Sequence, residues 1–145
     1  MKPARVAIGA LALGLASAAL WSCQTMGSTR PNQQAIAQQN TAFYQEQITL
    51  ARQALERHEW EAARQNFEGL VESLPATDPL GAESRAGLAQ IAFELGDYTR
   101  AAQVAAEVPP GTQWHVQALE YRGLAQLFSC DFENATQTFY QLAEV

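Results

Sequence analysis

From Thr41 to the end of the chain, apolar residues recur mostly at steps of three and four, the spacing that places them on one face of an α-helix. No segment is rich in β-branched residues that alternate with polar ones, as a half-buried strand would be. The sequence therefore predicts an all-α fold. The pattern divides into helical segments over about 41–58, 59–74, 82–96, 97–108, 112–129 and 131–145.

Residues that start and stop helices lie between these segments. Asp97 and Asp131 are expected to cap the fourth and sixth segments, because a carboxylate accepts the free N–H groups of a first turn. We expect Thr112 to cap the fifth segment in the same way. Gly96 can adopt the left-handed conformation that often ends a helix, and the Pro-Pro-Gly run at 109–111 is a strong helix stop.

One short motif occurs three times: an acidic residue, then an aromatic residue, then alanine three positions later. The last two aromatic residues are 34 positions apart, and the first two are 38 apart. A recurring period of this size is typical of helical repeat arrays. We therefore expect the three aromatic residues to occupy equivalent environments. The copies are Glu59-Trp60-x-x-Ala63, Asp97-Tyr98-x-x-Ala101 and Asp131-Phe132-x-x-Ala135.

Together with neighbouring positions, the motif resembles the tetratricopeptide repeat over about residues 44–145. In that family a small residue in the first helix faces the alanine of the second, and a further aromatic residue follows that alanine. Ala51, Ala89 and Gly123 match the small residue, and Phe67 and Phe139 match the further aromatic. The resemblance implies an α-solenoid of three helix pairs, over about 44–77, 82–111 and 112–145.

The resemblance also implies a concave groove lined by the first helix of each pair, where a segment of another protein would bind. The groove candidates mix amide, acidic and apolar side chains, which suits an extended or helical partner segment. Only Arg52 resembles the basic clamp that the family uses for C-terminal carboxylates, so we do not expect that binding mode. The candidates are Gln45, Ile48, Arg52, Glu83, Gln90, Phe93, Glu94, Gln117, Glu120, Leu124 and Phe128.

The last predicted helix has no helix after it to cover its apolar face. Phe139, Tyr140 and Ala143 are therefore expected to border solvent. Two explanations remain open: the chain is a piece of a longer protein, or this end docks on a partner such as a second copy of the chain.

The N-terminus has the pattern of a secretory signal. Lys2 and Arg5 precede an uncharged apolar run over 6–20, about 15 residues long, which is shorter than the roughly 20 needed to span a bilayer. The run ends in Leu20-Trp21-Ser22-Cys23, which resembles the processing site of bacterial lipoproteins. That resemblance implies a signal peptide over 1–22 and lipid chains on Cys23. The alternative is an ordinary cleaved signal.

Gln24 follows this cysteine and, by similarity to lipoprotein sorting in two-membraned bacteria, implies transfer to the outer membrane. Residues 23–40 are polar and contain Gly27, Ser28 and Pro31, so we expect a tether between the lipid and the helices. Its glutamine-rich half from Gln33 is also compatible with a helix that continues into the next segment.

Charge argues against nucleic acid as a partner. Without Lys2 and Arg5, seven of the nine basic residues remain against fifteen acidic ones. Such a chain lacks the basic surface on which affinity for phosphate backbones depends.

The sequence shows no catalytic, cofactor or metal-binding pattern, so we expect a protein that is not an enzyme. His58 and His115 lie at helix ends, without other ligands at metal-site spacing, and are expected to be surface residues. Cys130 has the same place in its turn as His58 and Gly96, and we expect a half-buried turn residue there.

These observations together predict a membrane-tethered interaction scaffold at the periplasmic face of the outer membrane. It resembles the repeat-containing lipoproteins of outer-membrane protein assembly and pilus assembly. One alternative is the recognition arm of a longer envelope enzyme. Another is a structural lipoprotein that forms homodimers through its C-terminal end.

Overall fold

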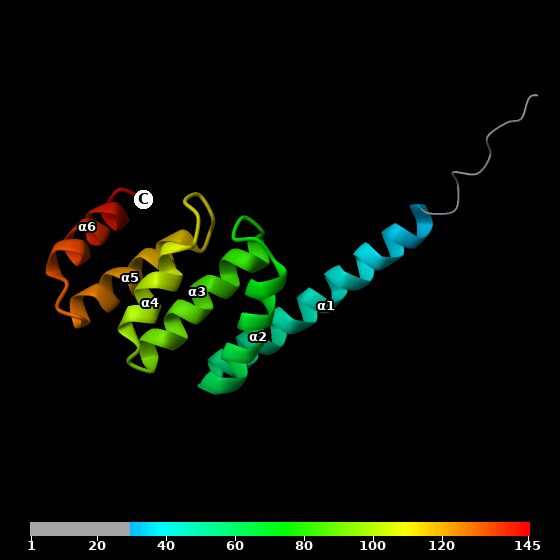
Figure 1. Cartoon of the computed structure of the whole chain (residues 1–145), viewed down its shortest axis with the longest axis horizontal. Coiled ribbons are helices and arrows are strands. Elements are labelled where there is room, and N and C mark those ends of the chain that lie inside the picture. Colours follow the sequence, from blue (N-terminus) through cyan, green and yellow to red (C-terminus); the bar gives the residue numbers. More distant parts are fainter. Residues whose placement is uncertain (1–29) are drawn as a thin grey trace, which may run out of the picture.

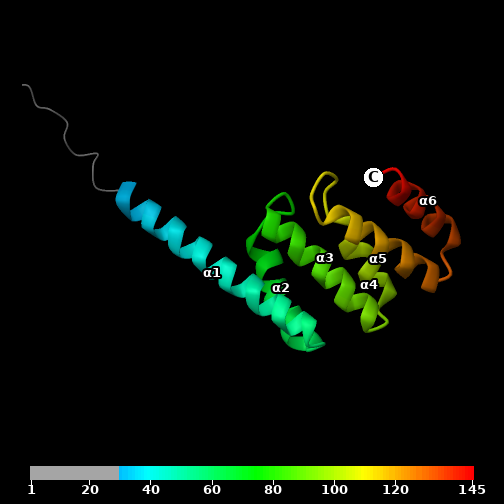
Figure 2. The same cartoon turned by 180° about the vertical axis from the view of Figure 1, so that it is seen from behind.

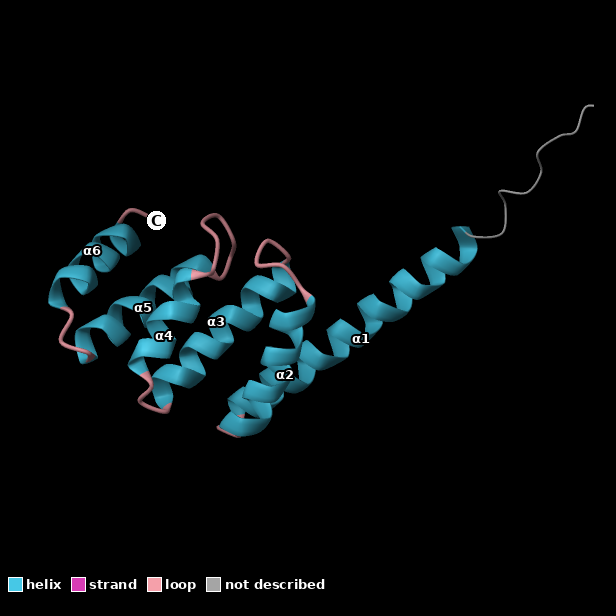
Figure 3. Ribbon diagram, in the orientation of Figure 1, coloured by secondary structure: helices cyan, strands magenta, loops and turns pink. Residues whose placement is uncertain are grey.

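The computed structural model describes the backbone of residues 30–145 and the side chains from Gln38 onward. Within these residues it contains six α-helices and no strand, as the hydrophobic pattern predicts (Figure 3). The predicted signal sequence, Cys23 and residues 24–29 of the predicted tether lie outside the described part. The helices are α1 (Arg30–Glu56), α2 (Trp60–Ser73), α3 (Pro79–Glu94), α4 (Tyr98–Ala106), α5 (His115–Phe128) and α6 (Phe132–Ala143).

The helices pack in consecutive pairs, α1 with α2, α3 with α4 and α5 with α6, and each pair packs against the next. The pairs follow one another along the molecule in the order of the sequence, as the two opposite views show (Figures 1 and 2). The turns within pairs lie at one end of the helices, and the connections between pairs lie at the other (Figure 3). The result is a row of antiparallel helical hairpins.

The first helix starts earlier than the hydrophobic pattern predicts. It begins at Arg30, eleven residues before Thr41, and its N-terminal part extends away from the other helices (Figure 1). The expected start at Thr41 is therefore wrong, and the alternative of a helical glutamine-rich segment holds. Proline is tolerated in a first helical turn, so Pro31 does not prevent this early start.

The three turns within the pairs have the same geometry, as the repeat predicts. His58, Gly96 and Cys130 all have positive φ, of 58°, 79° and 63°. The N–H group that follows each of them donates to a carbonyl five residues earlier, at 2.8–2.9 Å, which is a hydrogen bond of the Schellman motif. The next residue in each case is the repeated aromatic, and it is the first residue of α2, α4 or α6.

Two of the three predicted caps are confirmed. The N–H of Arg100 donates to the Asp97 carboxylate at 3.1 Å, and the N–H of Asn134 donates to the Asp131 carboxylate at 3.5 Å. The prediction for Thr112 is wrong. Its hydroxyl donates to the carbonyl of Pro109 at 3.0 Å, and α5 begins only at His115, where no side chain caps the helix.

The start of α3 also differs from the expectation. The helix begins at Pro79 rather than near Ala82. Asp78 caps it, because its carboxylate accepts from the N–H groups of Leu80 at 2.8 Å and Gly81 at 3.3 Å. Pro79 lacks an N–H but occupies the first helical position, where that donor has no partner within the helix.

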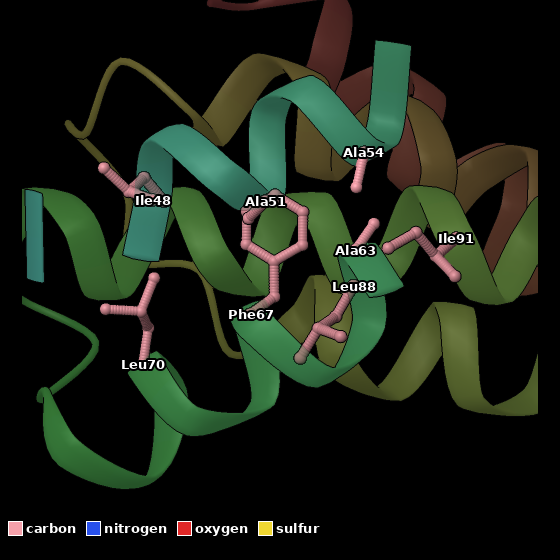
Figure 4. Packing of buried hydrophobic residues seen from close by; sticks show 8 residues of the cluster. All are labelled: Ile48, Ala51, Ala54, Ala63, Phe67, Leu70, Leu88 and Ile91. Carbon is pink, nitrogen blue, oxygen red and sulfur yellow. The ribbon is translucent and has the colours of Figure 1, made fainter. Parts of the chain in front are cut away.

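The small residues of the repeat lie where helices approach closely. Ala51, Ala63, Ala89 and Ala101 are all fully buried. Among the side chains that the structure describes, Phe67 of α2 is the largest fully buried one, and it packs among apolar residues of α1 and α3 (Figure 4). The main buried cluster consists of Ile48, Ala51, Ala54, Ala63, Phe67, Leu70, Leu88 and Ile91.

The repeated aromatic residues share a backbone position but not an environment. Trp60 packs against the main cluster, and Tyr98 packs against Phe128 of the following helix pair. Phe132 is 60% exposed, because among the described residues no helix follows α6 to cover it. The expectation of equal environments is therefore wrong for the third repeat.

At the C-terminal end, Tyr140 and Ala143 are exposed as expected. Phe139 is instead half-buried, because its ring lies against Gly123 of α5.

Candidate functional site

The predicted groove residues all lie on α1, α3 and α5. These three helices form one row, in which the backbone of α3 approaches those of both α1 and α5. The second helices of the pairs, α2, α4 and α6, are farther apart: among the described residues the backbone of α4 approaches neither α2 nor α6. One ion pair still joins two of them, between Arg100 of α4 and Glu68 of α2 at 3.0 Å. We call the side formed by α1, α3 and α5 the inner face.

A hollow of about 160 Å³ opens on this side of the molecule and reaches all three helices of the inner face. Three of its lining residues were predicted from the sequence: Arg52, Glu83 and Gln117. The sequence did not point to the other lining residues, because they come together only when separate helix pairs stack on one another. The complete lining is Arg52, Leu55, Glu56, Phe67, Glu83, Gly87, Trp114 and Gln117.

An ion pair joins α1 to α3 at this hollow. The Arg52 guanidinium donates to both carboxylate oxygens of Glu83, from Nε at 2.5 Å and from a terminal nitrogen at 2.6 Å. The hydrogen bond to Glu83 raises the pKa of Arg52. Glu83 is buried and Arg52 is half exposed. Because its charge is already paired, Arg52 is not a free receptor for a partner's carboxylate.

A second polar contact joins α3 to α5. The side-chain amide of Gln117 donates to the side-chain oxygen of Gln90 at 3.1 Å. Both side chains are partly exposed, so each keeps hydrogen-bonding capacity that could serve a partner's backbone.

Further along α3 and α5, aromatic side chains gather. The ring of Phe93 lies 5.5 Å from that of Phe128, 5.5 Å from Tyr98 and 5.7 Å from Tyr121, measured between centroids. Phe93 and Phe128 were predicted groove residues, whereas Tyr121 was missed. Helical spacing could have found it, since Gln117, Tyr121 and Phe128 follow one another at steps of four and seven.

The remaining candidates differ in accessibility. Gln45, Glu94 and Glu120 are exposed, and Leu124 is half-buried. Ile48 is fully buried in the main cluster, so it presents no surface to a partner. Ile48 belongs to the main cluster together with Phe67 and Leu70 of α2, and this packing buries it.

The single thiol and the two histidines of the described region do not form a site. Cys130 is exposed, not half-buried as expected, because its turn projects into solvent. His58 is exposed and its ring contacts Trp60. His115 is half-buried, and its Nδ1 has no hydrogen-bond partner, so the expectation of a surface residue is wrong there. Among the described residues no group of histidine, cysteine and acidic side chains could hold a metal ion.

No helix between residues 30 and 145 is both long enough and apolar enough to cross a membrane. Comparison of the chain with protein-family models, with curated proteins and with solved structures finds no match in any of the three.

Proposed function

We propose that the chain is an interaction scaffold of the bacterial cell envelope, tethered to a membrane, that holds a segment of another protein on its inner face. The hollow across α1, α3 and α5 is the observation that carries this proposal. A site shared by three helices from separate pairs can follow a partner segment over several residues. The partly exposed amides of Gln90 and Gln117 offer hydrogen bonds to the backbone of such a segment.

The proposal includes a relation to tetratricopeptide repeats. Three features support it: the three turns have the same geometry, alanine is buried at the same place in each pair, and an aromatic residue begins each second helix. Proteins built from stacked helix pairs use their extended inner surfaces mainly for binding.

The membrane tether is proposed from the N-terminal sequence. Lipid chains on Cys23 would hold the protein at the periplasmic face of the outer membrane, since two or more acyl chains give stable anchoring. Replacement of Cys23 by serine should release the protein from the membrane fraction. Mass spectrometry of the native N-terminal peptide should show the added acyl mass, and an unmodified cysteine in membrane-bound protein would refute the anchor.

The binding role is tested by recovering partners from solubilised membranes. We compare the full chain with Gln117→Arg, which places a larger, charged side chain at the hollow, and with Gln137→Arg, an exposed position on α6. A partner should be recovered with the unmodified chain and with Gln137→Arg but not with Gln117→Arg. Recovery of the same proteins by all three would count against binding at the inner face.

Self-association through α6 is a second candidate. Phe132 and Tyr140, 60% and 69% exposed, are large aromatic groups on one terminal helix. Exposed apolar groups of this kind favour association. Sedimentation of the full chain at micromolar concentration should show a dimer that Phe132→Ser with Tyr140→Ser converts to a monomer. A monomer before substitution would exclude this candidate.

A further inference from the structure

The aromatic residues at the end of the inner face lie beside two acidic side chains. Phe93, Tyr98, Tyr121 and Phe128 come from α3, α4 and α5, and their ring centroids are 5.3–5.7 Å apart in four pairs. Glu94 follows Phe93, and Glu120 precedes Tyr121. We call these six residues the aromatic–acidic patch.

The patch is accessible to a partner. Phe128 is 57% exposed, and Glu94 and Glu120 are both exposed, while Phe93, Tyr98 and Tyr121 are half-buried. A large aromatic side chain that stays open to solvent while packed on other rings is a frequent anchor of protein interfaces. The patch thus combines three half-buried rings with one exposed ring, that of Phe128.

Both carboxylates adjoin an aromatic residue of the patch in the sequence, Glu94 next to Phe93 and Glu120 next to Tyr121. Burial raises the pKa of the Tyr121 hydroxyl, and the charges of Glu94 and Glu120 raise it further. No ion pair joins either carboxylate to an arginine among the side chains from residue 38 onward. Two unpaired negative charges therefore flank the aromatic rings.

The hollow and the patch follow one another along α5. Gln117 lines the hollow and lies one helical turn before Tyr121 on α5, and Gln90 bonds to Gln117 one turn before Phe93 and Glu94 on α3. The hollow itself adds the acidic side chain of Glu56, while the charge of Arg52 is taken up by Glu83. The residues that line the hollow or form the patch thus include three carboxylates without an ion pair, while their one arginine is paired.

We propose that the partner is a basic protein segment, and that one of its arginine or lysine side chains binds at the aromatic–acidic patch while the rest follows the hollow. The faces of aromatic rings attract cations, and neighbouring carboxylates strengthen that attraction. An acidic segment would be repelled by Glu94, Glu120 and Glu56. This inference rests on the proposed binding role of the inner face.

The test is a selection from a library of short random peptides displayed on beads, with the purified full chain as bait. Selected peptides should be enriched in arginine and lysine. In fluorescence anisotropy, replacing the critical arginine with citrulline, its uncharged analogue, or a selected lysine with glutamine should weaken binding about tenfold, and higher salt should weaken it further.

Matched variants locate the site. Phe128→Ala should reduce affinity about tenfold, whereas Phe132→Ala, at a similarly exposed phenylalanine outside the patch, should leave it unchanged. Glu94→Gln with Glu120→Gln should act like Phe128→Ala, and Glu133→Gln on α6 should not.

The two proposals can fail separately. Peptides that bind without basic residues, or that respond to Gln117→Arg but not to the patch variants, would overturn the inference and leave the inner face as a binding site. If no peptide binds the folded chain, both proposals are overturned.

Discussion

Gly87 of α3 lies directly against Phe67 of α2, the largest fully buried side chain. A Cβ atom at this position would lie 2.6 Å from two atoms of the phenylalanine ring. Residues of α1 and α3 pack around the ring, so its main freedom to shift is toward the hollow that Phe67 and Gly87 both line. Gly87→Ala should therefore force the two helices apart and destabilise the fold.

The magnitude follows from two opposing effects. Alanine favours a helix interior over glycine by about 1 kcal/mol. Overpacking a closed contact costs about 1–3 kcal/mol. Gly69→Ala isolates the first effect, because Gly69 is an exposed position inside α2 with nothing within 4 Å of its Cβ direction. The free energy of unfolding of Gly87→Ala should be about 1–3 kcal/mol below that of Gly69→Ala.

Thermal and urea unfolding followed by circular dichroism measure this difference. The melting temperature of Gly87→Ala should be lower than that of Gly69→Ala by roughly 3–15 °C for a domain of this size. Gly123→Ala makes a similar contact with Phe139, at 2.7 Å, but that ring is half exposed and can move, so its effect should be smaller. Equal stabilities for the Gly87 and Gly69 variants would refute the packing described between α2 and α3.

Further predictions concern local structure. Asp97→Ala removes a cap and should lower the free energy of unfolding by about 1 kcal/mol, whereas Glu59→Ala, where no cap bond exists, should change it little. Cys130→Gly should stabilise the chain by about 1 kcal/mol in urea unfolding, because Cys130 has a φ of 63° that glycine adopts freely; a loss of stability would contradict the turn geometry. Because the pKa of Tyr121 is raised, its contribution to stability should be present below about pH 10 and lost as the pH rises through that raised value. Phenolate absorbance should show a lower pKa for Tyr121 after Glu120→Gln, and an unchanged value would place Glu120 away from the ring.

The sequence predicts best what local chemistry decides. The turns at His58, Gly96 and Cys130 and the caps at Asp97 and Asp131 depend on residues within a few positions of one another. The motif occurs three times, so the three copies can be aligned with one another residue by residue.

Contacts between separate pairs are harder to predict. Nothing near Arg52 in the sequence indicates that its partner is Glu83, because stacking of α1 on α3 sets that contact. Arg85 is similar: it is almost fully buried and donates to the carbonyls of Gly81 at 2.9 Å and Leu74 at 3.3 Å. Phe132 is more exposed than Trp60 and Tyr98 because no described helix packs over it, and the repeat pattern alone does not show which helices pack on each copy.

Helix starts show a third limit. Pro79 interrupts the pattern in sequence but begins α3 in the structure, because a capping aspartate precedes it. The hydrophobic pattern shows where a helix is buried, and α1 continues beyond that region to Arg30, so its start could not be located from apolar residues.

The most direct test of binding at the inner face is site-specific photo-cross-linking in cells that express the full chain. A photoreactive amino acid is placed at Gln117, beside the hollow, or at Gln137, exposed on α6. The proposed function predicts a discrete cross-linked partner from position 117 and none from position 137. No product from position 117, or equal products from both positions, would contradict it.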